Sequence, residues 1–216
     1  MIKPIYINII CLFLVLFLIL YVLQKRVNKY TYNKGISINR VNIPDIIHDS
    51  IPRIGNLDIV SDNFTITIVI IFFVVFLFNK QYKYIIFFAL LVILGNFICF
   101  IFFISTTFPD SSKVCKYSED TFKSLYNMGS CNNLGISGHF INILFILGIF
   151  YRYYGRKYLI LYILVYVTGF FTICVSRAHY TIDCLTSTFV ALFIIYEFNN
   201  IQKGVNYILG NKFFDL

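Results

Sequence analysis

The chain has 216 residues, of which 59% are hydrophobic and 13% are charged, and its mean hydropathy is +0.78. These values exclude an ordinary soluble domain, and several apolar runs approach or exceed the roughly 20 residues that a helix needs to cross a bilayer. The formal net charge of +8 does not indicate a nucleic-acid partner, because the basic residues lie in short loops and tails where lipid headgroups would contact them.

Six apolar segments follow one another along the chain and predict six transmembrane helices. We expect the first to be a retained anchor, because it is long for a secretory signal and no small-residue cleavage site follows it. The expected fold is an all-α membrane protein, a six-transmembrane-helix bundle, with residues 1–216 forming a single integral membrane domain. In chain order the segments are Ile5–Leu23, Phe64–Phe78, Tyr84–Ser105, Ser137–Tyr151, Tyr158–Ser176 and Thr181–Phe198.

The connections between these segments alternate in character. Asn79–Lys83 and Arg152–Lys157 are short and basic, whereas the long connections after the first and third segments carry most of the acidic residues. Short basic connections favour the cytoplasmic side, which would place both termini inside and the long connections outside. Four basic residues after the first segment oppose this orientation, so the charge distribution alone does not decide it: Lys25, Arg26, Lys29 and Lys34.

Two of the three histidines lie where helices are expected to begin. His139 opens the fourth segment and His179 precedes the sixth. Two helical passes of about 20 residues each separate them, so both should lie at the same depth on one face of the membrane. Asp183 follows His179 by one helical turn, and its carboxylate can accept the ring N–H and fix the tautomer. Polar residues within membrane spans are costly, which favours a functional site over ordinary helix caps.

A set of two histidines and one aspartate suits phosphoryl transfer. One imidazole can attack phosphorus, while the other gives a proton to the departing oxygen and later takes one from the acceptor. The N-termini of the fourth and sixth helices would offer free N–H groups to a phosphate. A zinc site is the alternative, but the sequence has no HExxH motif and no Cys-x-x-Cys pair, so we predict no metal and no cofactor. His48, in the first long connection, is expected to be a solvated surface histidine.

The segment "CNNLGISGHF" (Cys131–Phe140) and the segment "HYTID" (His179–Asp183) resemble the two catalytic motifs of the sphingomyelin synthase family. This family is the lipid phosphotransferase branch of the type 2 phosphatidic acid phosphatase superfamily. Asn42–Asp49 resembles the family's proline-rich segment after the first span, and Thr106–Cys115 resembles its turn before a cysteine. The resemblance covers about residues 44–198, with the motifs in the family's order, and the chain lacks the Arg-Pro dipeptide of the superfamily's orthodox phosphatases.

The resemblance implies an enzyme that moves a phospho-headgroup, phosphocholine above all, from a glycerophospholipid to ceramide and releases diacylglycerol. His179 would be the nucleophile, Asp183 would activate it, and His139 would act as acid and then as base. The implied location is an endomembrane (Golgi or ER) or the plasma membrane, with the site lumenal or extracellular. The residues expected to bind substrate or phosphate are Ser137, Gly138, Tyr180, Thr181 and Arg177, although an arginine that snorkels to the interface is an equal alternative for the last.

The chain departs from the family pattern beside its motifs. Asn132 and Asn133 stand where the family has Gly-Asp, and Phe140 stands where it has threonine. Three alternatives therefore stay open: headgroup exchange onto diacylglycerol, lipid phosphate hydrolysis, and a non-catalytic lipid-binding protein. Phosphoethanolamine and phosphoinositol are alternative headgroups.

Two cysteines share the long connection after the third segment. A disulfide between Cys115 and Cys131 would close a loop of about 15 residues, worth about 3 kcal/mol in the chain-entropy model. It would hold the chain that leads to His139, and two free thiols are the alternative. The cysteines inside the spans are expected to behave as small hydrophobic residues: Cys11, Cys99, Cys174 and Cys184.

Overall fold

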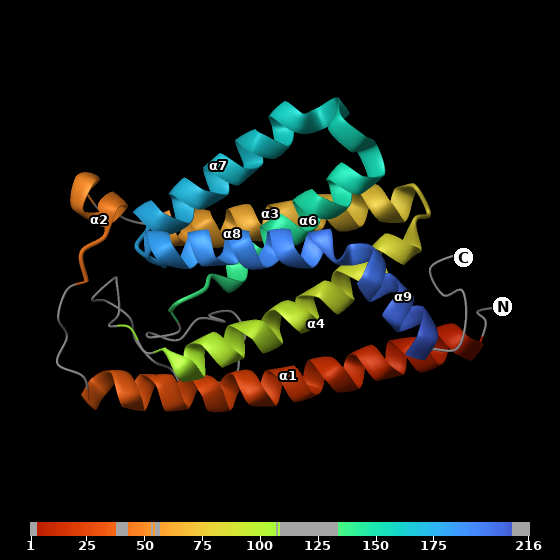
Figure 1. The fold of residues 1–216 in the computed structure, drawn as a ribbon, viewed down its shortest axis with the longest axis horizontal. Helices are drawn as coiled ribbons and strands as arrows, with labels where there is room; N and C mark the ends of the chain where they lie inside the picture. Colours follow the sequence, from red (N-terminus) through yellow and green to blue (C-terminus); the bar gives the residue numbers. More distant parts are fainter. Residues whose placement is uncertain are drawn as a thin grey trace.

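The computed structural model describes residues 4–37, 43–52, 54, 57–106, 108 and 134–208, and within these ranges it is helical, without any strand. The long helices run side by side as an elongated bundle (Figure 1). In chain order the elements are α1 (Pro4–Ser37), α2 (Ile46–Ser50), α3 (Leu57–Phe78), α4 (Tyr82–Ser105), α6 (Gly138–Tyr154), the 3₁₀ turn η1 (Gly155–Tyr158), α7 (Leu159–Val175), α8 (Thr181–Tyr196) and α9 (Phe198–Ile208).

The six predicted apolar segments correspond to α1, α3, α4, α6, α7 and α8. Among the described residues, three stretches are long and apolar enough to cross a membrane: Ile59–Phe78, Tyr82–Ser105 and Gly138–Val175. The bent pair α8 and α9 adds a fourth if it is counted as one span. These findings confirm an all-helical membrane protein, whereas the number of six spans stays a prediction.

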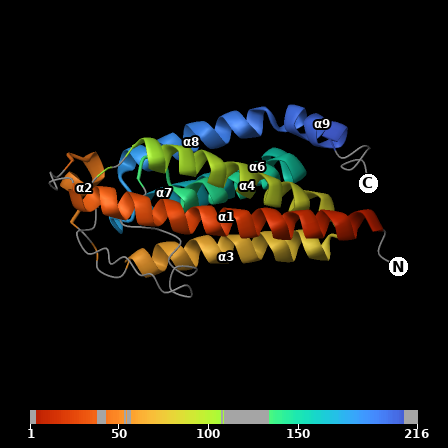
Figure 2. The ribbon, with the colours of Figure 1, turned by 90° about the horizontal axis from the view of Figure 1, so that it is seen from below.

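Helix α6 lies at the centre of the bundle and packs against α3, α4, α7 and α8. Its buried side chains are large and apolar, and Ile143, Phe145 and Ile146 are fully enclosed. Helix α1 lies along α4 (Figure 2). The outer faces of the helices also carry large apolar side chains, and these are exposed: Ile160 is 76% exposed and Phe189 is 72% exposed. Large exposed apolar surfaces of this kind suit contact with lipid chains.

Three glycines within the apolar segments lie where neighbouring helices approach one another closely. A Cβ atom added at Gly148 would lie 2.5 Å from Cδ1 of Ile195, and one added at Gly95 would lie 2.9 Å from the Phe145 ring. A Cβ atom at Gly169 would lie 3.3 Å from Cδ1 of Ile143. Glycine at these positions therefore lets α4, α7 and α8 approach the central helix α6 closely.

The turn η1 reverses the chain between α6 and α7, so α6 and α8 begin at the same end of the bundle (Figure 1). At the opposite end the chain bends by 58° between α8 and α9. Cys115 and Cys131 lie outside the described residues, so the disulfide stays a prediction. Cys99, Cys174 and Cys184 are buried free thiols, as expected of cysteines that act as small hydrophobic residues.

Candidate active site

The structure brings His179 and Asp183 together at the start of α8. Nδ1 of His179 lies 3.1 Å from Oδ2 of Asp183. The side chain of Asp183 has no exposed surface, and that of His179 is 12% exposed. The aspartate is the third residue of α8, where a carboxylate interacts favourably with the helix dipole.

The partners of Asp183 decide which nitrogen of His179 carries the proton. The carboxylate accepts the backbone N–H of Gly135 at 2.8 Å through Oδ1 and that of Tyr180 at 3.2 Å through Oδ2. Because these partners can only donate, Asp183 acts as an acceptor throughout, and Nδ1 of His179 carries the hydrogen. Nε2 of His179 therefore keeps its lone pair, as a nucleophile requires.

Gly135 has a positive φ of 106°, and a Cβ atom there would lie 2.8 Å from Oγ1 of Thr106. Both facts favour glycine at this position.

A serine on α8 ties the beginning of α6 to the same helix. The hydroxyl of Ser187 accepts the backbone N–H of Ser137 at 2.8 Å, and its own proton can go to the carbonyl of Asp183 at 2.7 Å. Ser137 itself caps α6 by accepting the N–H of Phe140. Beside it, a Cβ atom at Gly138 would meet nothing within 4 Å. The start of α6 is thus held firmly and keeps open space at Gly138.

His139 faces an acidic residue that the sequence analysis did not single out. Nε2 of His139 lies 3.5 Å from Oδ1 of Asp62 on α3, and the two side chains are 36% and 44% exposed. His139 is the second residue of α6 and His179 precedes α8, so the two histidines lie at the same end of the bundle. Asp62 lies just before the second apolar segment, and His139 lies at the start of the fourth. Both segments should begin on the same face of the membrane, so this shared depth could have identified Asp62 from the sequence.

Asp45 holds the short helix α2 against the start of α8. It caps α2 by accepting the N–H groups of Ile47 and His48 at 3.1 Å. It also accepts the N–H of Thr181 at 2.6 Å and the Thr181 hydroxyl at 2.7 Å. A carboxylate therefore occupies donors that we expected to face a phosphate, and a phosphate contact by Thr181 would require Asp45 to move away.

The prediction that His48 is a solvated surface histidine is wrong. His48 is buried, and its Nε2 lies 3.1 Å from the carbonyl oxygen of Cys174 and 3.2 Å from that of His179. Its ring packs against the ring of Tyr180 at 5.3 Å. Both polar partners are acceptors, so Nε2 carries the hydrogen. His48 therefore braces the turn that presents His179.

Arg177 lies in the same turn and points back to α2. Its φ is 60°, in the left-handed region, and Nη2 donates to the carbonyl of His48 at 2.6 Å. The residue therefore connects the α7–α8 turn to the end of α2. A contact with a phosphate oxygen stays a prediction for Arg177, as it does for Tyr180, which is buried at the N-cap of α8.

The environment of Asp45 leads us to expect that the stability of the fold depends on pH. Burial alone would raise the pKa of Asp45, but hydrogen bonds from Thr181 and from the backbone of His48 hold this pKa below its ordinary value of 3.8. A carboxyl with a lowered pKa stabilises the fold fully above its unfolded pKa, and this contribution is lost as the pH falls through the folded pKa. We therefore expect the thermal unfolding midpoint of the wild type to fall as the pH is lowered below 3.8.

The variant Asp45→Asn separates this effect from general acid unfolding. We expect a loss of about 2 kcal/mol at neutral pH, because one amide cannot accept all of these donors. The difference in stability between Asp45→Asn and the wild type should become smaller at acid pH, and thermal unfolding in detergent measures this difference. Glu197→Gln, at the opposite end of α8, is the control. A difference that stays constant across this pH range would contradict the assignment.

Residues 130–200 match a family model described as PAP2 superfamily C-terminal. The matched region contains α6, α7 and α8, and with them His139, His179 and Asp183. The match supports the PAP2 superfamily. Members of the PAP2 superfamily hydrolyse or transfer phosphate groups, which fits a lipid phosphatase or phosphotransferase. The match does not single out the sphingomyelin synthase branch of the PAP2 superfamily, and no curated protein matches the chain.

Proposed function

We propose that the chain transfers a phospho-headgroup, with phosphocholine as the expected one, from a glycerophospholipid to ceramide and releases diacylglycerol. The observation that carries the proposal is the pairing of His179 with the buried carboxylate of Asp183, with His139 at the same end of the bundle. This arrangement supports one nucleophilic imidazole and one imidazole that moves protons.

In the first half of the reaction, Nε2 of His179 attacks the phosphorus of the donor lipid. The bond between phosphorus and the diacylglycerol oxygen breaks, and His139, as an imidazolium, gives its proton to that oxygen. Asp183 stabilises the positive charge that develops on His179. Asp62 can orient the ring of His139 through the contact at Nε2. The products of this half are diacylglycerol and a headgroup phosphate bonded to His179.

In the second half, neutral His139 takes the proton from the ceramide hydroxyl. The hydroxyl oxygen attacks the same phosphorus, and the bond from phosphorus to Nε2 of His179 breaks. Water in place of ceramide would give hydrolysis, which is the second candidate function because PAP2 superfamily members include hydrolases. The same phosphohistidine serves both outcomes.

A mostly apolar pocket beside the site supports a lipid substrate. It has a volume of about 260 Å³ and lies at the start of α8. Ile46, Phe108 and Leu185 contribute to its wall, and Tyr180 and Thr181 connect it to the site. A pocket with such a lining can hold part of an acyl chain next to the reacting headgroup.

One experiment tests the proposed function against its alternatives. Membranes that contain the protein are incubated with fluorescent ceramide and mixed phospholipids, and the lipid products are separated. A new fluorescent phospholipid with release of diacylglycerol supports the proposal. Free phosphate or a phospholipid made from diacylglycerol would favour the alternative reactions, and no product at all would favour a non-catalytic lipid-binding protein.

His139→Ala should lower the rate of transfer by about 10²- to 10⁴-fold, the usual contribution of general acid–base catalysis. Asp62→Asn should lower the rate less, because the imidazole remains and loses only its carboxylate partner. Both rates are measured with the fluorescent ceramide at saturating donor lipid. An Asp62→Asn variant slower than His139→Ala would contradict these roles.

A further inference from the structure

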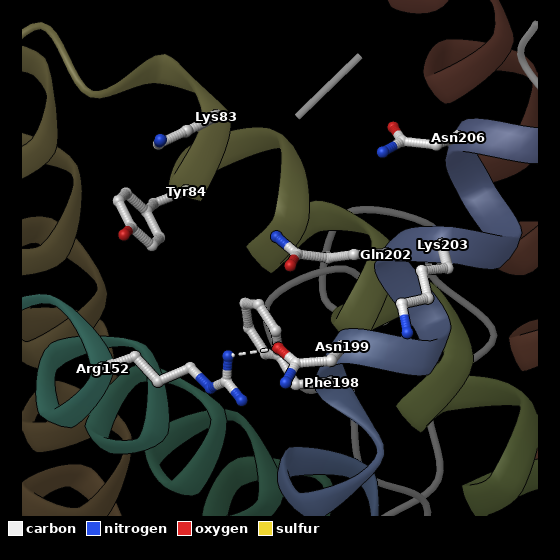
Figure 3. Close-up of a pocket in the computed structure, with 8 residues that line it drawn as sticks. All are labelled: Lys83, Tyr84, Arg152, Phe198, Asn199, Gln202, Lys203 and Asn206. Atoms are coloured by element: carbon white, nitrogen blue, oxygen red, sulfur yellow. Dashed lines mark hydrogen bonds between the residues drawn. The ribbon is translucent and has the colours of Figure 1, made fainter. Parts of the chain in front are cut away.

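A second pocket has a volume of about 480 Å³ and is lined by residues of α4, α6 and α9 (Figure 3). The bend between α8 and α9 lies at the end of the bundle opposite the start of α6 and α8 (Figure 1). Three cationic side chains from three helices line it: Lys83 on α4, Arg152 on α6 and Lys203 on α9. Amide side chains complete much of the wall, among them Asn199 and Gln202. None of the described residues that line this pocket carries a carboxylate.

The bend between α8 and α9 creates this pocket, and Phe198 fixes the bend. Phe198 is 3% exposed, and its ring centre lies 3.7 Å from that of Phe87 on α4. The guanidinium of Arg152 lies 4.1 Å from the centre of the Phe198 ring, and Nη1 of Arg152 donates to Oδ1 of Asn199 at 2.8 Å. These two contacts hold Arg152 in place before any ligand binds.

The chemistry of the wall favours a phosphate group. Arginine and lysine side chains bind phosphate oxygens through charge-assisted hydrogen bonds, and amide groups add neutral donors. Arg152, Gln202 and Lys203 extend into the space between α4, α6 and α9 (Figure 3). The wall therefore carries three positive charges without a lining carboxylate among its described residues, which favours a bound anion.

The position of the pocket favours a lipid as the source of that phosphate. Large aromatic side chains at the same end are almost fully exposed, with Phe78 84% and Tyr207 89% exposed. Aromatic rings of this kind are typical of the interface between lipid chains and water, where headgroups lie. We propose that this pocket binds the phosphate of an anionic membrane lipid, at a site separate from the one that performs the transfer reaction.

The test uses the full chain reconstituted in phosphatidylcholine vesicles with or without phosphatidylinositol 4-phosphate. Lipid retained after extraction into mild detergent is measured by native mass spectrometry. Lys83→Gln and Lys203→Gln should each lower retention of the anionic lipid about fivefold, since one basic residue near a membrane surface contributes about 1 kcal/mol. Lys157→Gln, at the same end but outside the pocket wall, should leave it unchanged.

Each outcome of this experiment decides something about the pocket. A lipid site is supported if Lys83→Gln and Lys203→Gln lose retention of the anionic lipid and inorganic phosphate does not displace this lipid from the wild type. If inorganic phosphate displaces the anionic lipid and also stabilises the lipid-free protein, the lipid assignment would be overturned in favour of free phosphate. Equal retention in both pocket variants and in Lys157→Gln would overturn the site. Arg152→Gln would also remove the contact with the Phe198 ring, so the test uses the two lysine variants instead.

Discussion

His179→Ala is expected to abolish headgroup transfer, with a loss of at least about 10⁴-fold in the rate per folded protein. The reason is that the variant lacks the one protein side chain that bonds to phosphorus in the proposed reaction. The protein should remain folded in the membrane, because Asp183 keeps the N–H groups of Gly135 and Tyr180 as partners. The rate is measured with fluorescent ceramide, and folding by thermal unfolding in detergent.

His179→Gln is the matched control for this prediction. Its side-chain amide can still donate to Asp183, but it cannot attack phosphorus. We therefore expect the glutamine variant to be as inactive as the alanine variant and at least as stable. Transfer within tenfold of the wild-type rate in either variant would show that His179 is not the nucleophile.

Asp183→Asn is expected to lower the rate about 10⁴-fold, the loss seen when a carboxylate that fixes the tautomer of a catalytic histidine becomes an amide. The carboxylate of Asp183 accepts from Gly135, Tyr180 and His179, and an asparagine must turn an NH₂ group toward at least one of them. Loss of this buried charge should also cost about 3 kcal/mol of unfolding free energy. Activity and unfolding are measured on the same preparation.

Ser187→Ala separates the loss of activity from the loss of stability. The hydroxyl of Ser187 is buried one helical turn beyond Asp183. Its hydrogen bonds go to backbone groups of Ser137 and Asp183 and not to a histidine ring. Its removal should cost about 1–3 kcal/mol and leave the tautomer of His179 unchanged. An equal loss of rate in Ser187→Ala and Asp183→Asn would mean that stability, and not the tautomer, explains both.

The sequence was sufficient to predict the helical segments and the position of the two histidines at one end of the bundle. The helices follow from apolar runs, and the common end follows from their length, because two passes return the chain to the same face. The contact between His179 and Asp183 follows from the spacing of one helical turn. The close approaches at Gly95 and Gly148 were predictable for a similar local reason, since small residues let membrane helices pack closely.

The parts that were missed depend on contacts between distant segments. Asp45 and Thr181, and likewise His48 and Cys174, meet only because α2 folds back onto the α7–α8 turn. Helix α2 has five residues, too few for a periodic pattern, although aspartate is a favoured residue at a helix N-cap. The bend after Tyr196 was missed because the predicted sixth segment was extended through Glu197 to Phe198 as one helix, whereas α8 ends at Tyr196.

The phosphohistidine intermediate is the central claim, and it can be trapped. The protein is incubated with a donor lipid labelled in its headgroup phosphate, without ceramide, and is then denatured in base because the phosphorus–nitrogen bond is labile to acid. Peptide mapping should find the label on His179, and ceramide added before denaturation should carry the label into a new phospholipid. A label on His139, or steady transfer without any labelled histidine, would contradict the proposed mechanism.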